Sequence, residues 1–398
     1  MLTTAQARER ILAAMQRLPA ESVSLAASAG RVLRQTIVAE RDQPPFDRVM
    51  MDGIAVAYDV IAAGNTSFPI QATQAAGDAA LGLDDGAAIE IMTGAALPSG
   101  ADCIIPVERI AVANGVATLE SGYRAERNQF VHPRASDHAA GTHLLQPGRH
   151  IAPADIAVIA SAGLATVDVT RPVVARVIST GNELIAAGEA IAPHQVRMSN
   201  GPALVALLAR HGHTDCGHEH IADNKQALRE RIGAHLDEAD TLILSGGVSM
   251  GKADYVPAIL AELGVTVSFH RISQRPGKPM WFGTGPRGQA VFALPGNPVS
   301  ALVCCRQYVL PALAHASGLN ASAPEFASLA SEVTFKPNLT CFQPVKLVSN
   351  AAGQVLAMPV KTNTSGDFTA LSGTDGYVEL AQEETHFTAG TSVILRRW

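Results

Sequence analysis

Four short loops between residues 180 and 298 combine glycine with polar or cationic residues, which are the residue types that can hold a phosphate or another oxyanion. They are Thr180-Gly181-Asn182-Glu183, Ser245-Gly246-Gly247-Val248-Ser249, Pro276-Gly277-Lys278-Pro279 and Leu294-Pro295-Gly296-Asn297-Pro298. Glycine lets the backbone approach a ligand closely, and the free N–H groups of a turn that enters a helix attract negative charge. Arg275, Lys278 and Ser249 add further hydrogen-bond donors. Any one of these loops could be only a tight turn, but the four together predict an oxyanion site.

Three carboxylates stand beside the same loops and could hold a divalent cation. Glu183 belongs to the first loop, Asp223 follows the next apolar run, and Asp254 follows the Gly246-Gly247 loop. Oxygen ligands next to phosphates usually position Mg²⁺, which takes few protein ligands and keeps several waters. Asp223 and Asp254 could each instead cap a helix, and for Asp223 we favour the cap when the spacing is considered alone. The sequence thus predicts a magnesium site whose candidate ligands are Glu183, Asp223 and Asp254.

Two common nucleotide-binding motifs are missing from the sequence, and this narrows the class of ligand. There is neither the G-x-x-x-x-G-K-[ST] pattern of P-loop proteins nor a G-x-G-x-x-G pattern after the first strand of the expected sheet. Ordinary ATPases and NAD-dependent dehydrogenases are therefore disfavoured, and we expect a different nucleotide-like ligand.

The elements that must position these loops alternate between strands and helices. Apolar runs predict strands at 173–179, 214–220, 241–244, 265–270 and 289–294. Helical spacing predicts helices at 202–210, after Asp223, at 254–263 and from Pro298 onward. This alternation specifies a parallel sheet with helices on both faces. Ligands of such sheets bind outside the carboxyl ends of the strands, so we expect all four loops to converge on that edge.

The rest of the 398 residues divides into further regions. Residues 1–17 have the apolar spacing of an amphipathic helix. Short apolar runs between turn residues predict a small, inserted β-rich domain over residues 41–134. Residues 319–398 return to strand alternation, which predicts a β-barrel or sandwich. We therefore expect a multidomain α/β plus β protein with its central α/β domain at residues 171–318.

Composition and charge exclude several classes of protein. Apolar residues make up 47% and charged residues 17% of the chain, which is near the globular average. The formal charge of −6 gives no support to a nucleic-acid binder, which needs clustered Lys and Arg. No apolar stretch of about 18 residues and no signal-peptide core is present. We expect a cytoplasmic protein that binds small molecules, without nucleic-acid or membrane partners.

The cysteines and histidines argue against a disulfide framework or a structural zinc site. The five cysteines form no C-x-x-C pair, which fits a reducing compartment. One cluster could suggest a softer metal ion, namely His211, His213, His218 and His220 around Cys216. We favour the interpretation that His211-Gly212 ends a helix and that the other residues form a strand and its flanks.

With these motifs the sequence resembles the molybdopterin molybdotransferases, the family that includes bacterial MoeA and the E domain of gephyrin. The matching motifs are Met51-Asp52-Gly53-Ile54-Ala55-Val56, Ile91-Met92-Thr93-Gly94-Ala95 with Pro98 and Gly100-Ala101-Asp102, Ser179 to Leu184, Ser245 to Gly251 with Asp254, Pro276-Gly277-Lys278-Pro279 and Leu294 to Ser300. They follow the family's order and spacing over nearly the whole chain, so a single shared domain is a poor explanation.

The resemblance implies four domains and a homodimer. The domains would be an elongated linker and dimerisation domain with an N-terminal helical segment, the inserted β-rich domain, the molybdopterin-binding α/β domain and the C-terminal β-barrel, at residues 1–40 with 135–170, 41–134, 171–318 and 319–398. The active cleft would lie between the α/β domain of one subunit and the inserted β-domain of the other.

The resemblance also implies a magnesium-dependent enzyme that inserts molybdate into adenylylated molybdopterin, releases AMP and forms the molybdenum cofactor. The catalytic residues implied are Asp52, Thr93 and Asp137 from one subunit and Glu183, Asp223 and Asp254 from the other. The cofactor-binding residues implied are Thr180, Gly181, Asn182, Ser245, Gly246, Gly247, Ser249, Arg275, Gly277, Lys278, Pro295, Gly296, Asn297 and Pro298. Partner proteins would be a molybdopterin adenylyltransferase and molybdoenzyme apoproteins or their chaperones.

The charges of these residues indicate which role each of them can take. A cleft lined by carboxylates repels a tetraoxo dianion, so the acids are assigned to Mg²⁺ and to proton delivery, and the cationic and N–H groups to the oxyanions. Replacing oxo ligands by thiolates releases water and needs protons, and carboxyl groups that lie close together can keep protons because like charges raise their pKa.

Some positions depart from the family pattern, and two other functions stay open. Val49 and Ile54 stand where the family usually has Ser and Tyr around Met-Asp-Gly, Ser136-Asp137 replaces an acidic pair, and Thr364-Ser365-Gly366-Asp367 replaces Gln-Gly-Ser-Gly. The alternatives are adenylylation of molybdopterin by the α/β domain and a non-catalytic scaffold like gephyrin. The extra domains disfavour the first, and the retained acids disfavour the second.

Overall fold

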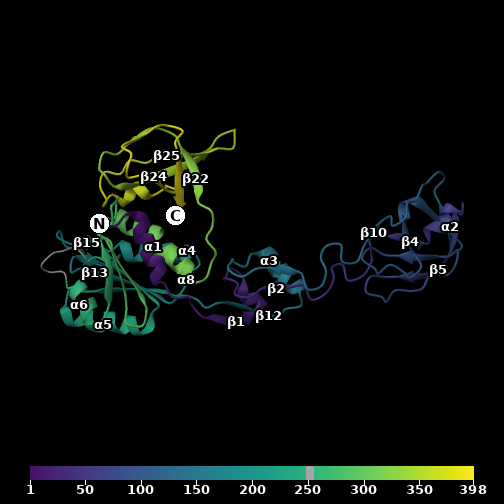
Figure 1. The fold of residues 1–398 in the computed structure, drawn as a ribbon, viewed down its shortest axis with the longest axis horizontal. Coiled ribbons are helices and arrows are strands. Elements are labelled where there is room, and N and C mark those ends of the chain that lie inside the picture. Colours follow the sequence, from purple (N-terminus) through teal and green to yellow (C-terminus); the bar gives the residue numbers. More distant parts are fainter. Residues whose placement is uncertain (248–254) are drawn as a thin grey trace.

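The protein is elongated, with its globular parts gathered at the two ends of a slender middle segment. The computed structural model describes residues 1–247 and 255–398. Figure 1 shows an α/β domain and a β-barrel side by side at one end and a separate β-rich domain at the other. Ser249 and Asp254, two of the site residues expected from the sequence, lie outside the described residues.

A six-stranded sheet forms the centre of the α/β domain. Its strands, in spatial order, are β16 (Cys216–Ile221), β13 (Ala175–Thr180), β17 (Thr241–Ser245), β21 (Ala290–Leu294), β20 (Trp281–Thr284) and β18 (Thr266–His270). The first four are parallel, but β20 runs antiparallel to both of its neighbours. The expectation of an all-parallel sheet is therefore wrong, and the sheet is mixed. The short segment β20 returns beside β21 without a crossover helix, which an antiparallel pair does not need.

Helices cover both faces of this sheet, as the alternation predicts. They are α4 (Asn200–Arg210), α5 (Lys225–Glu238), α6 (Val256–Glu262), α7 (Pro298–Cys304) and α8 (Leu310–Ala316). One apolar core includes residues of α4, α7 and α8, and a second includes residues of α5 and α6. The cap of α5 is Asn224, whose side chain accepts from the N–H of Ala227. The favoured interpretation of Asp223 as a helix cap is wrong, and its carboxylate is left for another role.

The N-terminal helix belongs to the α/β domain by its packing. Helix α1 (Thr4–Ala14) begins with a reciprocal capping box between Thr3 and Gln6. Its buried residues Ala7 and Ile11 join the core that α8 also lines. The apolar face of α1 is therefore buried on the α/β domain, although the sequence predicts that residues 1–40 belong with the elongated domain.

The slender middle segment is built from two stretches of chain that run out to the β-rich domain and back. β1 (Ala20–Ser24) pairs antiparallel with β12 (Thr166–Thr170), and β2 (Ile37–Val38) pairs with β11 (His143–Leu145). Helix α3 (Pro153–Ser161) adds Ile159 to a small core of its own. Each strand of the segment thus depends on a partner more than 100 residues away in sequence.

The β-rich domain is one six-stranded sheet with apolar clusters that share its strands. In spatial order the strands are β7 (Cys103–Pro106), β4 (Gly53–Val56), β6 (Ala88–Ile91), β5 (Ser67–Gln74), β9 (Val116–Leu119) and β8 (Ile110–Ala113). The short pair β3 (Arg48–Val49) and β10 (Val131–His132) lies where the chain enters and leaves. The runs that predicted strands, near residues 54–58 and 87–92, form β4 and β6.

The C-terminal unit is a closed barrel of five strands. They are, around the ring, β24 (Thr340–Ser349), β25 (Val355–Pro359), β22 (Glu325–Leu329), β28 (Ser392–Arg397) and β26 (Gly376–Leu380), and β26 pairs back to β24. The expected barrel is confirmed. A two-residue strand from the α/β domain, β19 (Gln274–Arg275), adds in parallel to β24. This pairing joins the barrel to the α/β domain through backbone hydrogen bonds.

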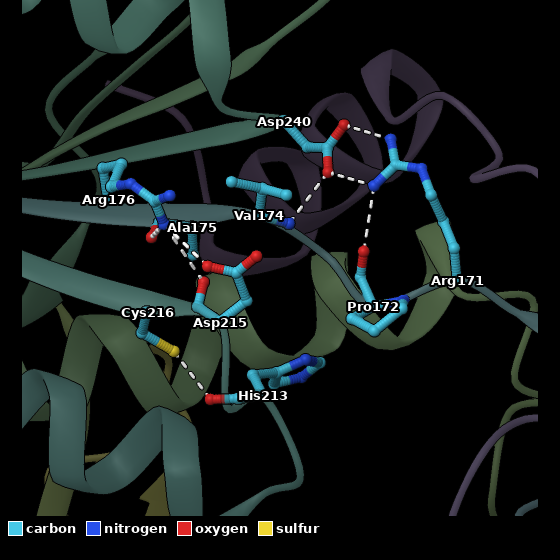
Figure 2. Close-up of polar contacts among 9 residues, drawn as sticks. All are labelled: Arg171, Pro172, Val174, Ala175, Arg176, His213, Asp215, Cys216 and Asp240. Atoms are coloured by element: carbon cyan, nitrogen blue, oxygen red, sulfur yellow. Dashed lines mark hydrogen bonds and ion pairs between the residues drawn. The ribbon is translucent and has the colours of Figure 1, made fainter. Parts of the chain in front are cut away.

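Ion pairs close the amino edge of the α/β sheet (Figure 2). The guanidinium of Arg171 donates to both carboxylate oxygens of Asp240 at 2.7 and 2.6 Å, and the same carboxylate accepts from the N–H of Val174 at 2.9 Å. Arg176 donates to Asp215 at 3.0 Å. Asp240 and Asp215 therefore each have a cationic partner. Elsewhere, among the helices described, none is long and apolar enough to cross a membrane.

Candidate active site

A cavity of about 400 Å³ opens at the carboxyl edge of the same sheet. Three of the four glycine loops line it, namely those after β13, β17 and β21, together with the start of α4 and one side chain from the barrel. The lining residues include Thr180, Glu183, Asn200, Ser245, Gly246, Gly296, Asn297, Pro298 and Phe368. Its volume lies within the usual range of small-molecule sites. The expectation that these loops meet at one rim is correct for three of them.

Asn200 at the start of α4 fastens two of these loops together. Its Nδ2 atom donates to Ser245 Oγ at 2.9 Å and to the carbonyl oxygen of Gly296 at 2.7 Å. Because a carbonyl oxygen only accepts, this contact fixes which end of the amide faces the loops. The Oδ1 atom is buried and has no hydrogen-bond partner among the described residues, and the same holds for Thr180 Oγ1. Both atoms belong to residues that line the cavity, and neither has a partner in the part of the chain that the structure describes.

Gly246 allows two of the loops to approach one another closely. It has φ +95°, and a Cβ at this position would lie 2.6 Å from the carbonyl oxygen of Thr180. Both the left-handed backbone and the lack of space therefore require glycine there. Gly181 has φ +140°, which also favours glycine. Histidines of β16 support the first loop, since His220 Nε2 lies 2.9 Å from the Gly181 carbonyl oxygen and His218 Nε2 lies 2.9 Å from Ser179 Oγ.

Two carboxylates lie at the rim on either side of Asn182. The N–H of Asn182 donates to Asp223 at 3.3 Å, and the N–H of Asp223 donates to the Asn182 side chain at 3.0 Å. Glu183 is exposed and lines the cavity. The described residues contain no cluster of three His, Cys, Asp or Glu side chains arranged to hold a metal ion. Mg²⁺ commonly uses one or two protein carboxylates together with substrate phosphates and water, so Glu183 and Asp223 fit that donor set.

The fourth loop lines a different, neighbouring cavity. Arg275 and Pro276 contribute to a space of about 230 Å³ between the α/β domain and the barrel, where Lys361 also lies. The two cavities are separate because of the order of the strands. The chain leaves the edge strand β18, pairs with the barrel strand β24 through β19, and then forms this loop. Gly277 is buried against Cys304 and the Gln274 amide, while Lys278 is exposed. This loop therefore forms a second, cationic site and does not complete the first.

Gly247 and Pro295 belong to loops that line the first cavity but are not lining residues themselves. The barrel segment Thr364 to Phe368 separates the two cavities, since Ser365 lines the second and Phe368 lines the first.

Asp52 and Thr93 form a compact pair in the β-rich domain. The backbone N–H and the hydroxyl of Thr93 donate to Asp52 Oδ1 at 2.6 and 2.7 Å. These two hydrogen bonds, the backbone one first, lower the pKa of Asp52. No neighbouring carboxyl group contributes to this shift within one chain, so the expectation that crowded carboxyl groups retain protons stays a prediction for the cleft between two subunits. Asp137 lies farther along the chain and contacts His132 Nε2 at 3.1 Å.

The β-rich domain and the α/β domain lie at opposite ends of the chain (Figure 1), so Asp52 does not meet Glu183 or Asp223 within one copy. A site that uses both groups needs a second copy of the chain.

The histidine cluster considered in the sequence separates in space. His218 and His220 point to the loop after β13, as described above, whereas His211 and His213 line a cavity of about 100 Å³ with His150. Burial, with smaller contributions from His211 and His150, lowers the pKa of His213 to about 4.

Several residues that line the cavity, among them Asn200 and Phe368, are not among the site residues expected from the sequence. Asn200 stands next to Ser199 at a helix start, where it resembles an ordinary capping residue. Phe368 lies in a barrel segment that departs from the family pattern, and no local signal links it to loops 70 or more residues away. Only the packing of the barrel against the α/β domain brings Phe368 to the cavity.

Profiles of three protein regions match successive parts of the chain. Residues 2–163 match the MoeA N-terminal region (domain I and II), residues 176–315 match a probable molybdopterin binding domain, and residues 327–395 match the MoeA C-terminal region (domain IV). Together the matches account for each part of the fold described above.

Individual relatives agree over the full length. A molybdopterin molybdenumtransferase of Synechocystis sp. is 38% identical over 400 residues and covers 100% of both chains. One of Haemophilus influenzae is 30% identical and covers 99% of this chain and 98% of the relative. The crystal structure of a molybdopterin biosynthesis MoeA protein from Pyrococcus horikosii has a TM-score of 0.84 at 28% identity, covering 100% of this chain and 99% of that chain. The resemblance in the motifs is confirmed, and the chain belongs to the molybdopterin molybdenumtransferase (MoeA) family.

Proposed function

We propose that this chain inserts molybdenum, supplied as molybdate, into the dithiolene of adenylylated molybdopterin and releases AMP. Membership of the molybdopterin molybdenumtransferase family gives the class of reaction. The observation that supports it most directly is the cavity of about 400 Å³, which is lined by backbone turns at Thr180, Gly246 and Gly296 and by the carboxylate of Glu183. Asp223 is held beside the first of these turns by Asn182. Close-lying glycine backbone suits a phosphorylated ligand. We infer that the reaction takes place in the cytoplasm.

The two neighbouring cavities divide the substrates by charge. The first cavity is lined by the carboxylate of Glu183 as well as the guanidinium of Arg197, whereas the lining of the second includes two cationic side chains and no carboxylate, so a free dianion is favoured in the second. Arg275 and Lys361 line the second cavity, and Lys278 is exposed on the same loop. We therefore assign the adenylylated pterin to the first cavity and molybdate to the cationic loop, with Arg275 and Lys278 as donors to its oxygens.

A divalent cation fits the first cavity. Glu183 and Asp223 would hold Mg²⁺ together with the pyrophosphate of the substrate, and Asp254, which lies outside the described residues, is assigned to the same ion. When bound, the ion would offset the charge of the pyrophosphate that leaves with AMP. The Asn182 side chain keeps Asp223 in place through their two reciprocal hydrogen bonds.

Asp52 acts in this proposal as an ionised carboxylate. Its pKa is lowered by Thr93, so at neutral pH it is suited to accept protons from the dithiol as the sulfur atoms bind molybdenum, or to contact a cation. The two protons released by the dithiol equal the two that one oxo group needs to leave as water, so Asp52 can pass them on while Glu183 and Asp223 hold Mg²⁺.

The active unit is a homodimer in this proposal, because Asp52 and Asp223 lie at opposite ends of one chain (Figure 1). A symmetric dimer can bring the β-rich domain of one subunit to the α/β domain of its partner. The slender middle segment sets the reach of that contact. The molybdopterin adenylyltransferase and the receiving apoproteins or their chaperones are assigned as transient partners.

Complementation between two inactive variants tests both the reaction and the shared site. Asp52→Asn and Asp223→Asn should each abolish conversion of adenylylated molybdopterin and molybdate to the molybdenum cofactor and AMP. After the two are unfolded together and refolded as a mixture, heterodimers carry one intact site, and about a quarter of wild-type activity should return for a twofold-symmetric dimer.

The proposal is wrong if either variant, folded normally, keeps wild-type activity, and the shared site is wrong if the refolded mixture stays inactive. Incubation with ATP and molybdopterin alone serves as the control for the adenylylation alternative, and adenylyl transfer without molybdate consumption would favour that alternative.

A further inference from the structure

The first cavity has an aromatic wall that comes from the barrel. Phe368 lines this cavity although its neighbours in sequence belong to the C-terminal domain, and its side chain is 48% exposed. Exposure of a large aromatic side chain beside a cavity leaves apolar surface uncovered, which a ligand can cover. The residue is therefore a candidate for direct contact with the substrate.

The segment that carries Phe368 is fastened to the α/β domain on both sides. Before it, the Ser365 carbonyl oxygen accepts from the N–H of Val299 at 3.1 Å, and Ser365 Oγ accepts from the Asn297 side chain at 2.7 Å. After it, Leu371 is 8% exposed and packs against Val299. These contacts fix the position of the segment relative to α7. Phe368 is thus held in place over the cavity rather than carried on a free loop.

The rest of the cavity divides into polar and apolar groups of residues. The ends of β13, β17 and β21 supply the hydroxyls and glycines. Leu184, Val196 and Met198 supply apolar surface from one connected stretch, since β14 (Leu184–Ile185) pairs with β15 (Val196–Arg197) and the N–H of Met198 donates to the Ile185 carbonyl oxygen at 2.9 Å. A ligand with a charged phosphate end and a flat apolar face suits this lining.

From this geometry we propose that Phe368 stacks on the fused nitrogen heterocycle of the substrate and that the barrel thereby forms one wall of the substrate site. The proposal rests on the proposed function for the substrate, which carries two rings of this kind, adenine and pterin. Stacking of an aromatic side chain on either ring uses the same chemistry. In the reaction, Phe368 is a substrate-binding residue that places the phosphates near Gly246.

Binding of two separate probes, AMP and neopterin, to Phe368→Ala tests the proposal. Loss of a stacking partner should weaken the binding of one probe by about tenfold, and the probe affected identifies which ring lies there. Phe368→Tyr keeps the ring face and should restore the affinity. Phe326→Ala is the matched control, because Phe326 is a barrel phenylalanine that is 53% exposed and lines neither cavity. Its affinities should equal those of the wild type.

Wild-type affinity of Phe368→Ala for both probes overturns the proposal, as does an equal loss in Phe326→Ala or a wild-type protein that binds neither probe. Failure of the proposed function looks different. If Phe368 governs binding of one ring but the wild-type protein does not convert molybdate, the stacking site stands and the proposed reaction fails. If the wild type converts molybdate and Phe368→Ala binds both probes normally, only the stacking site fails.

Discussion

The two edges of the central sheet use the same residue types in opposite ways. At the amino edge, Asp240 accepts two hydrogen bonds from Arg171 and one from a backbone N–H (Figure 2). At the carboxyl edge, Glu183 and Asp223 form no ion pair with any described residue, and Asp223 accepts only from a backbone N–H. Asp240 and Asp215 are thus paired with cations, whereas Glu183 and Asp223 have no cationic partner within residues 1–247 and 255–398, as the proposed metal site requires.

The lack of ion pairs between described residues at the carboxyl edge means that this edge contributes less to stability than the amino edge does. An unpaired carboxylate next to others adds repulsion, and unpaired buried atoms such as Asn200 Oδ1 add a desolvation cost. Functional sites commonly carry such costs, which the rest of the fold offsets. The comparison therefore makes opposite predictions for the same substitution at the two edges.

Replacement of a carboxylate by its amide should have the largest effect. Asp223→Asn is expected to lower molybdenum insertion on the order of a hundredfold or more, while the free energy of unfolding stays the same or rises. Asp240→Asn should leave activity near the wild-type value but lower stability by about 1–2 kcal/mol, because Arg171 loses its partner. Steady-state assays and denaturant unfolding measure the two quantities. Equal stability losses at both positions would contradict the comparison.

Replacement of a glycine by alanine should have the next largest effect, and the loss of stability should differ between the two edges. In Gly246→Ala, the left-handed backbone and the contact with the Thr180 carbonyl oxygen add together, and we expect a loss of about 3 kcal/mol and weaker substrate binding. Gly212 at the amino edge also has positive φ, +84°, but a Cβ there meets nothing within 4 Å. Gly212→Ala should therefore cost only about 1 kcal/mol and leave KM unchanged. Thermal unfolding and substrate titration distinguish these outcomes, and a Gly246→Ala variant as stable as Gly212→Ala would show that the loop is not tightly packed.

The last prediction concerns the change in stability with pH at the amino edge of the sheet. The folded-state pKa of His213 is lowered to about 4 from an ordinary value near 6.5, so the unfolded chain binds more protons between these pH values. Stability contributed by neutral His213 is therefore present above pH 6.5 and lost as pH falls toward 4, by on the order of 2 kcal/mol. In His213→Asn the free energy of unfolding should change less over this range. An unchanged pH profile in that variant would mean that another group governs the transition.

Much of the α/β domain could be predicted because its signals are local. The spacing of apolar residues and the length of the apolar runs predicted strands β13, β16, β17, β18 and β21. Gly212 predicted the end of α4. Strand β20 was missed because Trp281–Thr284 is short and pairs antiparallel, so no crossover helix announces it. Asn224 rather than Asp223 became the cap of α5, and a pattern of two adjacent capping residues does not decide between them.

The site could be predicted only in the part that one domain supplies. Glycine loops after parallel strands converge because sheet geometry requires it, and this placed Thr180, Gly246 and Gly296 correctly. The position of the Arg275 loop depends on the edge strand and on the barrel pairing, which local sequence does not encode. Asn200 and Phe368 reach the cavity through tertiary contacts, so no spacing rule could identify them.

The strand β19 couples two parts of the molecule that would otherwise be separate folding units. Because Gln274 and Arg275 pair with β24 while their neighbours belong to the α/β domain, the barrel cannot detach without breaking backbone hydrogen bonds at the cationic loop. The α/β domain and the barrel should consequently melt together, whereas the β-rich domain, attached through the slender middle segment, is free to unfold in its own transition. A calorimetric scan should then show two transitions, one for the domain that carries Asp52 and one for the α/β domain together with the barrel.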